Sequence, residues 1–203
     1  MRAVARTSIL TQRLHLRAPE PTQAEAVLDF FERNRAHLAP WEPPRDADFY
    51  NLDFQRDRLQ ADAEAFAAGR AFAYWLQQRE DTSGRLLGQV HFSNVVRGVL
   101  QGAMLGYSLA GAEQGRGLMH EALAAGIDEM FSERVMLHRL QANVRPDNLR
   151  SRALLARLGF ASEGLARHYL YIDGAWRHHL MTARLNPQFG GPPGTRCQGA
   201  LRP

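Results

Sequence analysis

Two glycines at the start of an apolar helix pattern constrain this chain more than any other feature. They are Gly115 and Gly117 in the stretch AEQGRGLMHEALAAGIDEMF, which covers residues 112–131. A glycine inside a helix costs about 1 kcal/mol relative to alanine, and its advantage is that the backbone can approach another group closely. Because the first amides of a helix lack partners and lie at the positive end of its dipole, this stretch predicts a phosphate-binding site.

Three known motifs with similar residues do not fit this stretch. A P-loop needs a lysine after its second glycine, and the chain contains no lysine, so that all 25 of its basic residues are arginine. A dinucleotide-binding fingerprint needs a third glycine where His120 stands. The zinc-protease pattern H-E-x-x-H lacks its second histidine, because Ala124 stands at that position.

The hydrophobic pattern predicts one α/β domain built on a mixed sheet. The expected strands cover residues 11–19, 71–78, 86–96, 102–110, 138–144, 160–170 and 175–185. The expected helices cover residues 21–35, 52–69, 117–131 and 147–159. The first half of the sheet should be antiparallel, and a β-α-β crossover should follow. We place the domain in residues 1–186 and expect the Gly- and Pro-rich residues 187–203 to form a disordered tail.

The order of these elements resembles the GNAT superfamily of N-acetyltransferases, which bind acetyl-coenzyme A (acetyl-CoA). The pyrophosphate loop of that family follows the pattern Q/R-x-x-G-x-G/A, and Gly115 and Gly117 match its two small positions. Ala112 stands where the family has Gln or Arg, which removes one side-chain contact and leaves the backbone cradle. The resemblance therefore implies a GNAT-like fold with a splayed central strand and acetyl-CoA as co-substrate.

Further segments resemble the RimJ-type enzymes, which acetylate the N-terminal alanine of a ribosomal protein. They are LAPWEP, FSNVVRG, GRGLMHEAL, RPDNLRSRALLARLGF and YLYIDGAWRHH. The resemblance implies a cytoplasmic acyltransferase whose partner is the N-terminus of a ribosomal protein, with no membrane and no specific nucleic acid involved. Direct attack by the amine in a ternary complex is the implied mechanism, and the oligomeric state stays open.

The resemblance also implies which residues bind acetyl-CoA. The strand before the loop would be splayed from its neighbour, so that its backbone groups face the thioester, where a fixed donor can contribute about 3 kcal/mol. The implied residues are Leu105, Tyr107, Ser108, Leu109, Gln114, Gly115, Arg116, Gly117, Leu118, Met119, Asn143 and Asn148. An ordinary core strand, a glycine-rich helix start without a ligand, and a helix cap at Asn148 remain open as alternatives.

Two catalytic residues are implied by the same family. Glu163, in GFASEG, matches the glutamate to which the related enzymes assign the role of base. Such a base suits an α-amino group, whose pKa is about 7.7–8.0. Ser151, in DNLRS, stands at the position proposed for the acid that protonates the departing thiol, with Tyr169 and Tyr171 in reserve. A surface turn at Glu163 and a backbone-bonded serine at Ser151 remain open.

The acceptor site is expected around the proline-rich loop that begins at residue 37. Trp41, Glu42 and Asn94 are its candidate residues, although the tryptophan would equally well seal the edge of the core. His178 and His179 alternate faces on the last strand and have no acidic or cysteine cluster nearby, so no metal site is expected.

Composition leaves more than one function open. The net charge of +4 and the modest basicity permit work near nucleic acid without requiring it. A GNAT enzyme acting on a small amine, such as an antibiotic, a polyamine or an amino acid, is one alternative. A ribosome-associated assembly or binding factor with secondary catalysis is another. The one cysteine, Cys197, excludes an intramolecular disulfide.

Overall fold

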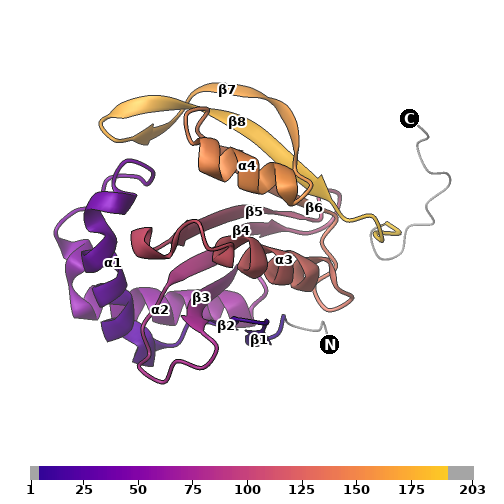
Figure 1. Cartoon of the computed structure of the whole chain (residues 1–203). Helices are drawn as coiled ribbons and strands as arrows, with labels where there is room; N and C mark the ends of the chain where they lie inside the picture. Colours follow the sequence, from indigo (N-terminus) through magenta and orange to yellow (C-terminus); the bar gives the residue numbers. More distant parts are fainter. Residues whose placement is uncertain (1–4, 192–203) are drawn as a thin grey trace.

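One eight-stranded sheet runs through the computed structural model, which describes residues 5–191 (Figure 1). Its strands are β1 (Ser8–Leu10), β2 (Leu14–Arg17), β3 (Phe72–Gln78), β4 (Gly88–Val96), β5 (Gly102–Leu109), β6 (Arg139–Val144), β7 (Ala161–Ile172) and β8 (Ala175–Leu185). The α-helices are α1 (Ala24–Leu38), α2 (Leu52–Ala67), α3 (Leu118–Phe131) and α4 (Leu149–Arg157). Short 3-10 helices lie at Pro21–Gln23, Asp48–Tyr50 and Gly111–Glu113.

The described strands lie in the order β1-β2-β3-β4-β5-β6-β8-β7. Neighbours are antiparallel except β5 and β6, which run parallel and are joined through α3. The expected mixed sheet with an antiparallel first half and a β-α-β crossover is therefore confirmed. The sequence analysis missed β1, because three residues are too few to show a strand period. The predicted tail begins at residue 187, and its residues from 192 onward lie outside the described range.

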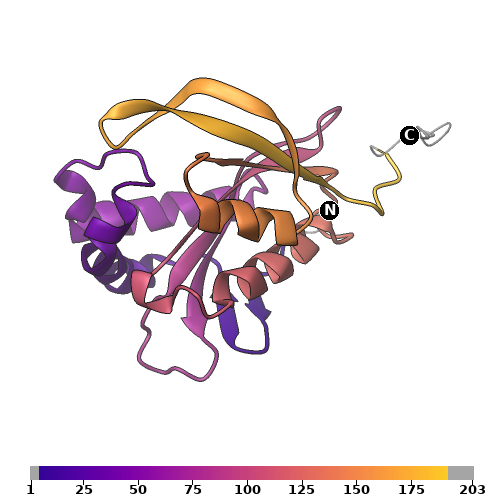
Figure 2. The same ribbon diagram turned by 45° about the horizontal axis from the view of Figure 1, so that its top comes forward.

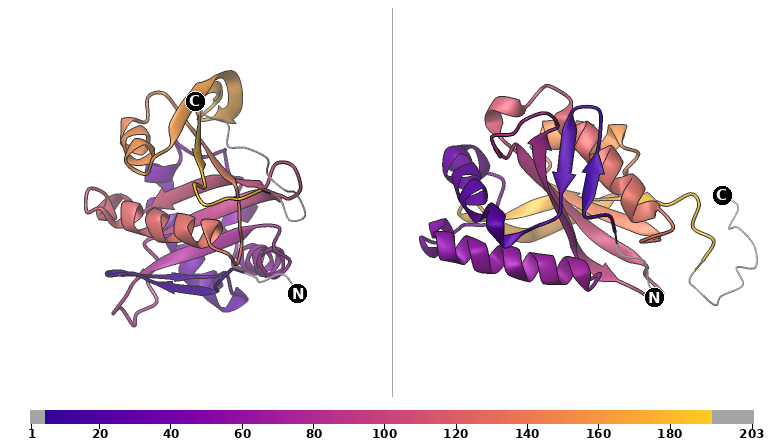
Figure 3. Two further views of the ribbon diagram at one scale, coloured as in Figure 1. Left: turned by 90° about the vertical axis from the view of Figure 1, so that its right-hand side faces the viewer. Right: turned by 90° about the horizontal axis from the view of Figure 1, so that it is seen from below.

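The helices cover both faces of the sheet, with α1 and α2 on one face and α3 and α4 on the other (Figure 3). Alternate residues of a strand point to opposite faces, so each strand contributes to two cores. Val90 and Phe92 of β4 belong to the core that includes α3. Trp75 of β3 instead packs edge-on against Phe30 and Phe31 of α1. The sheet therefore lies between the two pairs of helices, and its interior strands are covered on both faces.

The pairing between β5 and β6 stops early. It joins Gly102 to Arg139, Ala103 to Leu140 and Met104 to Gln141, and goes no further in the described chain. The other edge of β5 stays paired with β4 along the whole strand, as far as the Gly88–Leu109 pair. Residues Leu105–Leu109 therefore have one edge of backbone groups without a strand partner, and the splayed central strand that the sequence predicted is present.

The hairpin of β7 and β8 arches away from this split and towards the segment that follows α1 (Figures 1 and 2). Its ladder is irregular between Ser162 and Gly164 and again between Ala166 and Leu170. Such bulges bend a strand and increase its twist. The bent hairpin thus approaches the segment after α1 (Figures 1 and 2).

The start of α3 is fixed by the β1–β2 hairpin. One carboxylate oxygen of Glu121 accepts hydrogen bonds from the Thr11 hydroxyl and the Arg13 backbone N–H, at 2.6 and 2.7 Å. The other oxygen accepts from Arg13 Nε at 2.7 Å, and Arg13 Nη1 donates to the Arg116 carbonyl at 2.8 Å. The glycine-containing loop is therefore held from the neighbouring hairpin.

Close approach of β4 and β5 depends on Gly88. A Cβ at this position would lie 2.4 Å from the backbone oxygen of Ser108, which cannot move without displacing β5. We expect Gly88→Ala to lower the free energy of unfolding by about 1–3 kcal/mol, as overpacking usually does, in a urea denaturation experiment. Gly106→Ala is the matched control on the facing strand, because a Cβ there meets no atom within 4 Å. Equal stability of the two variants would contradict this account.

Candidate active site

A cavity of about 1390 Å³ occupies the split between β5 and β6. Residues from both faces of the sheet line it. The α3/α4 face contributes the glycine loop and the first turns of those two helices, including Gly115, Leu118 and Ser151. The opposite face contributes the end of α1, the segment after it, and side chains of β4, including Trp41 and His91. The cavity therefore connects the two faces of the sheet.

The glycine loop presents a row of free backbone donors to this cavity. Gly115 and Gly117 adopt left-handed φ values of 77° and 76°, which a side chain would strain. Within the described residues, the N–H groups of residues 115–120 donate to no carbonyl or side chain, and Gly117 caps α3 without a side-chain bond. Consecutive free amides at a helix start form an anion cradle, which fits the pyrophosphate of a coenzyme A.

Two hydroxyl groups lie together next to the unpaired edge of β5. The Tyr107 hydroxyl and Ser151 Oγ are 2.6 Å apart. Burial raises the pKa of Tyr107 to about 12, although its hydrogen bond with Ser151 acts in the opposite direction. The phenol therefore keeps its proton near pH 7, and the pair can donate a proton to a group in the split. Asn148 caps α4 by accepting a hydrogen bond from the Ser151 N–H at 3.1 Å, so its predicted capping role is present.

The other predicted acetyl-CoA residues divide into two groups. Those that line the cavity are Leu105, Ser108, Leu109, Gln114, Leu118, Met119, Asn143 and Asn148, together with the residues described above. Arg116 is absent from the lining, and its guanidinium pairs with Glu113 at 2.5 Å. Asn143 donates to the Tyr169 hydroxyl at 3.1 Å. Tyr169 is therefore bonded to a residue of β6, and it is not part of the cavity lining.

Gln114 links three elements across the cavity, which the sequence analysis did not foresee. Its amide lies 3.1 Å from His37 Nε2 of α1, and its carbonyl oxygen accepts a hydrogen bond from Arg150 of α4. All three residues line the cavity. The bridge ties the loop to the helices on both sides of the split.

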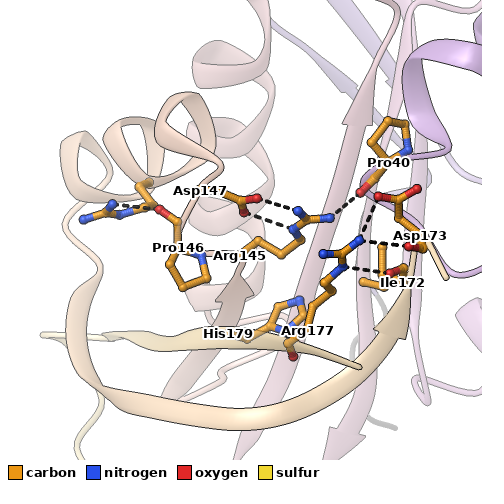
Figure 4. Close-up of polar contacts among 9 residues, drawn as sticks. Pro40, Arg145, Pro146, Asp147, Ile172, Asp173, Arg177 and His179 are labelled. Atoms are coloured by element: carbon orange, nitrogen blue, oxygen red, sulfur yellow. Dashed lines mark hydrogen bonds and ion pairs between the residues drawn. The ribbon is translucent and has the colours of Figure 1, made fainter. Parts of the chain in front are cut away.

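Arg145 holds the segment after α1 in place (Figure 4). It donates to the Pro40 carbonyl at 2.7 Å and pairs with the Asp147 carboxylate. Its guanidinium carbon also lies 5.0 Å from the centre of the Trp41 ring. Because these partners are on different elements, Arg145 fixes Trp41 at the rim of the cavity. No local sequence pattern reveals this contact, since Arg145 and Pro40 are 105 residues apart.

Among the three predicted acceptor residues, Trp41 and Glu42 line the cavity and Asn94 does not. Glu42 pairs with Arg45, and both side chains are only 19% exposed. Burial raises the pKa of the Glu42 carboxyl above its usual value, against the effect of Arg45. Asn94 lies where the β4–β5 ladder shifts register and has a positive φ of 50°. The structure therefore brings two of the three residues together.

Glu163, the predicted base, lies outside the cavity lining. Both of its carboxylate oxygens accept hydrogen bonds from the guanidinium of Arg139, one of them at 2.8 Å. These hydrogen bonds hold the pKa of Glu163 below its usual range. A carboxylate that is paired with an arginine and has a low pKa is a weak base. The structure thus separates Glu163 from Ser151 and Tyr107.

Two further features bear on what the site uses. In the described part of the chain, no group of three or more His, Cys, Asp or Glu side chains is arranged to hold a metal ion. None of the described helices has the length and apolar character needed to cross a membrane.

Comparisons with known proteins agree with this geometry. Residues 13–161 match the family model described as an acetyltransferase (GNAT) domain. The chain is 40% identical over 187 residues to the ribosomal protein uS5-alanine N-acetyltransferase of Escherichia coli (strain K12). The aligned region covers 92% of this chain and 94% of that protein. The chain is 35% identical over 174 residues to the probable N-acetyltransferase YjcK of Bacillus subtilis (strain 168), covering 86% and 94%.

Solved structures show the same likeness. The ribosomal-protein-S5-alanine acetyltransferase from Vibrio fischeri superposes with a TM-score of 0.86 at 35% identity, covering 91% of this chain and 99% of that one. The RimJ protein of Mycobacterium smegmatis, solved in complex with CoA-disulfide, superposes with a TM-score of 0.79 at 34% identity, covering 88% and 85%.

The glycine cradle can be tested by binding. We expect Gly117→Ala to weaken the affinity for coenzyme A about tenfold in isothermal titration calorimetry, because a left-handed alanine costs about 1–2 kcal/mol and displaces the free amides. Gly84→Ala is the matched control, since Gly84 has a φ of 77°, against 76° at Gly117, and lies in the β3–β4 connection outside the cavity. An unchanged dissociation constant for Gly117→Ala would show that the loop is not the cradle.

Proposed function

This chain belongs to the GNAT acetyltransferase family, and we propose that it transfers the acetyl group of acetyl-CoA to the N-terminal α-amine of a ribosomal protein that begins with alanine. Relatives named for that activity on ribosomal protein S5 align with nearly the whole chain, which supports the choice of acceptor. Ribosomal proteins are made in the cytoplasm, where we place the reaction.

One observation carries the proposal, namely that a continuous cavity joins the amide cradle to the opposite face of the sheet. Direct transfer between two substrates requires both to be bound at once, with their reacting groups in contact. We infer that acetyl-CoA occupies the α3/α4 side of the split and that the acceptor enters from the side of Trp41 and Glu42. A cavity reached along the segment after α1 suits the free end of a peptide better than a residue inside a folded domain.

We assign the binding of acetyl-CoA, which supplies the acetyl group, to backbone groups of this chain. The N–H groups of residues 115–120 hold the pyrophosphate, and the unpaired edge of residues 105–109 holds the pantetheine arm. The hydroxyl pair of Tyr107 and Ser151 keeps a proton available for the departing sulfur. Because the donors are fixed by the fold, they need no rearrangement during the transfer.

The acceptor side combines an aromatic ring with a partly buried carboxylate. We propose that Trp41 contacts the first residues of the peptide and that Glu42 accepts a hydrogen bond from its amine. Arg45 pairs with Glu42 and acts to lower the pKa of its carboxyl, against the larger effect of burial, which raises it. Arg145 serves as a positioning residue, since it lines the cavity and holds Trp41 and the Pro40 carbonyl in place.

The choice of acceptor can be tested with a set of amines. With saturating acetyl-CoA, we expect turnover of a peptide that carries a free N-terminal alanine, and none of the same peptide with a blocked N-terminus. Spermidine and an aminoglycoside should be poor substrates, because neither fits an approach built for a peptide end. Turnover of the small amines alone would leave the fold and the transfer intact and contradict the proposed substrate.

Direct transfer predicts a specific kinetic pattern. Initial rates with both substrates varied should give intersecting double-reciprocal lines, and no exchange of label between acetyl-CoA and CoA should occur without the acceptor. Cys197→Ser should keep the wild-type rate, because the one cysteine of the chain is not needed as an acyl carrier. Parallel lines together with a loss of activity in Cys197→Ser would establish a covalent acyl-enzyme instead.

A further inference from the structure

His91 lies on the acceptor side of the cavity, next to the place where β5 separates from β6. It is on β4, directly opposite Gly106 of β5, and both residues line the cavity. Directly paired residues of an antiparallel ladder point to the same face. A Cβ at Gly106 would meet no atom within 4 Å, so the His91 ring borders open space. That space adjoins Leu105 and Tyr107, on the edge assigned to the pantetheine arm.

The surroundings of His91 leave its ring neutral and unbonded. Burial lowers the pKa of His91 below its ordinary value, while the charge of Asp62 acts to raise that pKa and the charge of Arg58, also on α2, acts to lower it. In the described chain, no residue forms a hydrogen bond with its ring nitrogens. A neutral imidazole with an available lone pair is a suitable proton acceptor near pH 7.

The titratable groups that share the acceptor side of the cavity with His91 have partners of their own. Glu42 pairs with Arg45, and Arg145 pairs with Asp147. On the remaining sides, His37 of α1 contacts Gln114, and His179 of β8 is bonded to the Arg177 carbonyl. Glu163 is held by Arg139 outside the lining. His91 is therefore the group on the acceptor side that combines a free lone pair with a place beside the split.

We propose that His91 is the general base of the transfer. This inference rests on the proposed function in one respect, namely that the acceptor is an amine. The neutral amine forms an N–C bond with the acetyl carbon, and the C–S bond breaks with its electron pair on sulfur. One amine proton passes to a His91 ring nitrogen, directly or through one water. The sulfur takes a proton from the Tyr107–Ser151 pair, which regains it from His91 through solvent, so that protons balance.

The test begins with the acceptor that the wild-type enzyme turns over, whether the alanine peptide or a small amine. This choice separates the base assignment from the question of substrate. With both substrates saturating, the wild-type kcat should rise with pH through a value below about 6.5, because His91 acts only when it is neutral. His91→Asn should lower kcat about 100-fold and abolish this acid limb.

Three further variants make the result specific. His15→Asn is the matched control, because His15 is on β2, bonded to Ser8 and outside the cavity, and its profile should stay that of the wild type. Added imidazole should raise the kcat of His91→Ala at least tenfold over its value without imidazole. A purely structural role of His91 would not allow such a rescue. Glu163→Gln tests the competing base and should retain the acid limb. Thermal melts report whether each variant folds. If His91→Asn does not fold, His91→Gln takes its place.

The outcomes decide the assignment. Loss of rate and of the acid limb in His91→Asn, with rescue of His91→Ala by imidazole, supports His91 as the base. A kcat within threefold of the wild type in His91→Asn would overturn it. Loss of the acid limb in Glu163→Gln would overturn it as well. So would a slow His91→Asn enzyme that keeps the acid limb, together with a His91→Ala enzyme that imidazole does not rescue.

Discussion

The early end of the β5–β6 ladder is the constraint on which the rest of this molecule depends. Each of the two strands is held firmly at its other edge, β5 by β4 and β6 by β8, so the gap between them is a property of the fold. Backbone groups without a strand partner need another hydrogen-bonding partner. In the described chain, residues 105–109 thus leave an unpaired backbone edge inside the sheet, at a cavity that is lined from both faces of the sheet.

The remaining elements place chemical groups around this gap. The Arg13–Glu121 contacts fix the start of α3 and with it the free amides of the glycine loop. The Asn148 cap fixes the first turn of α4 and with it Ser151. On the other face, Arg145 ties the segment after α1 to the end of β6. Each contact joins the cavity lining to a neighbouring element of the fold, which explains how a cavity of about 1390 Å³ keeps a defined lining.

The sequence predicted the features that depend on local pattern. Gly115 and Gly117 stand where a strand is followed by a helix, so the phosphate cradle that we propose for them follows from their immediate neighbours. The position of Glu163 depends on Arg139, which lies 24 residues away and on a strand that is not its neighbour. The setting of His91 likewise depends on Gly106 and on α2. Strand alternation places His91 on a polar face, and only the assembled sheet shows what faces it.

The most direct test of this account is a crystal structure of the protein with both coenzyme A and an alanine-ended peptide bound. The account predicts the pyrophosphate on the amides of residues 115–120, the pantetheine arm along residues 105–109, and the peptide on the opposite face. Its N-terminal nitrogen should lie within reach of His91, directly or through one water. A peptide that enters from the α3/α4 side, or a pantetheine arm outside the β5–β6 gap, would contradict the central claim.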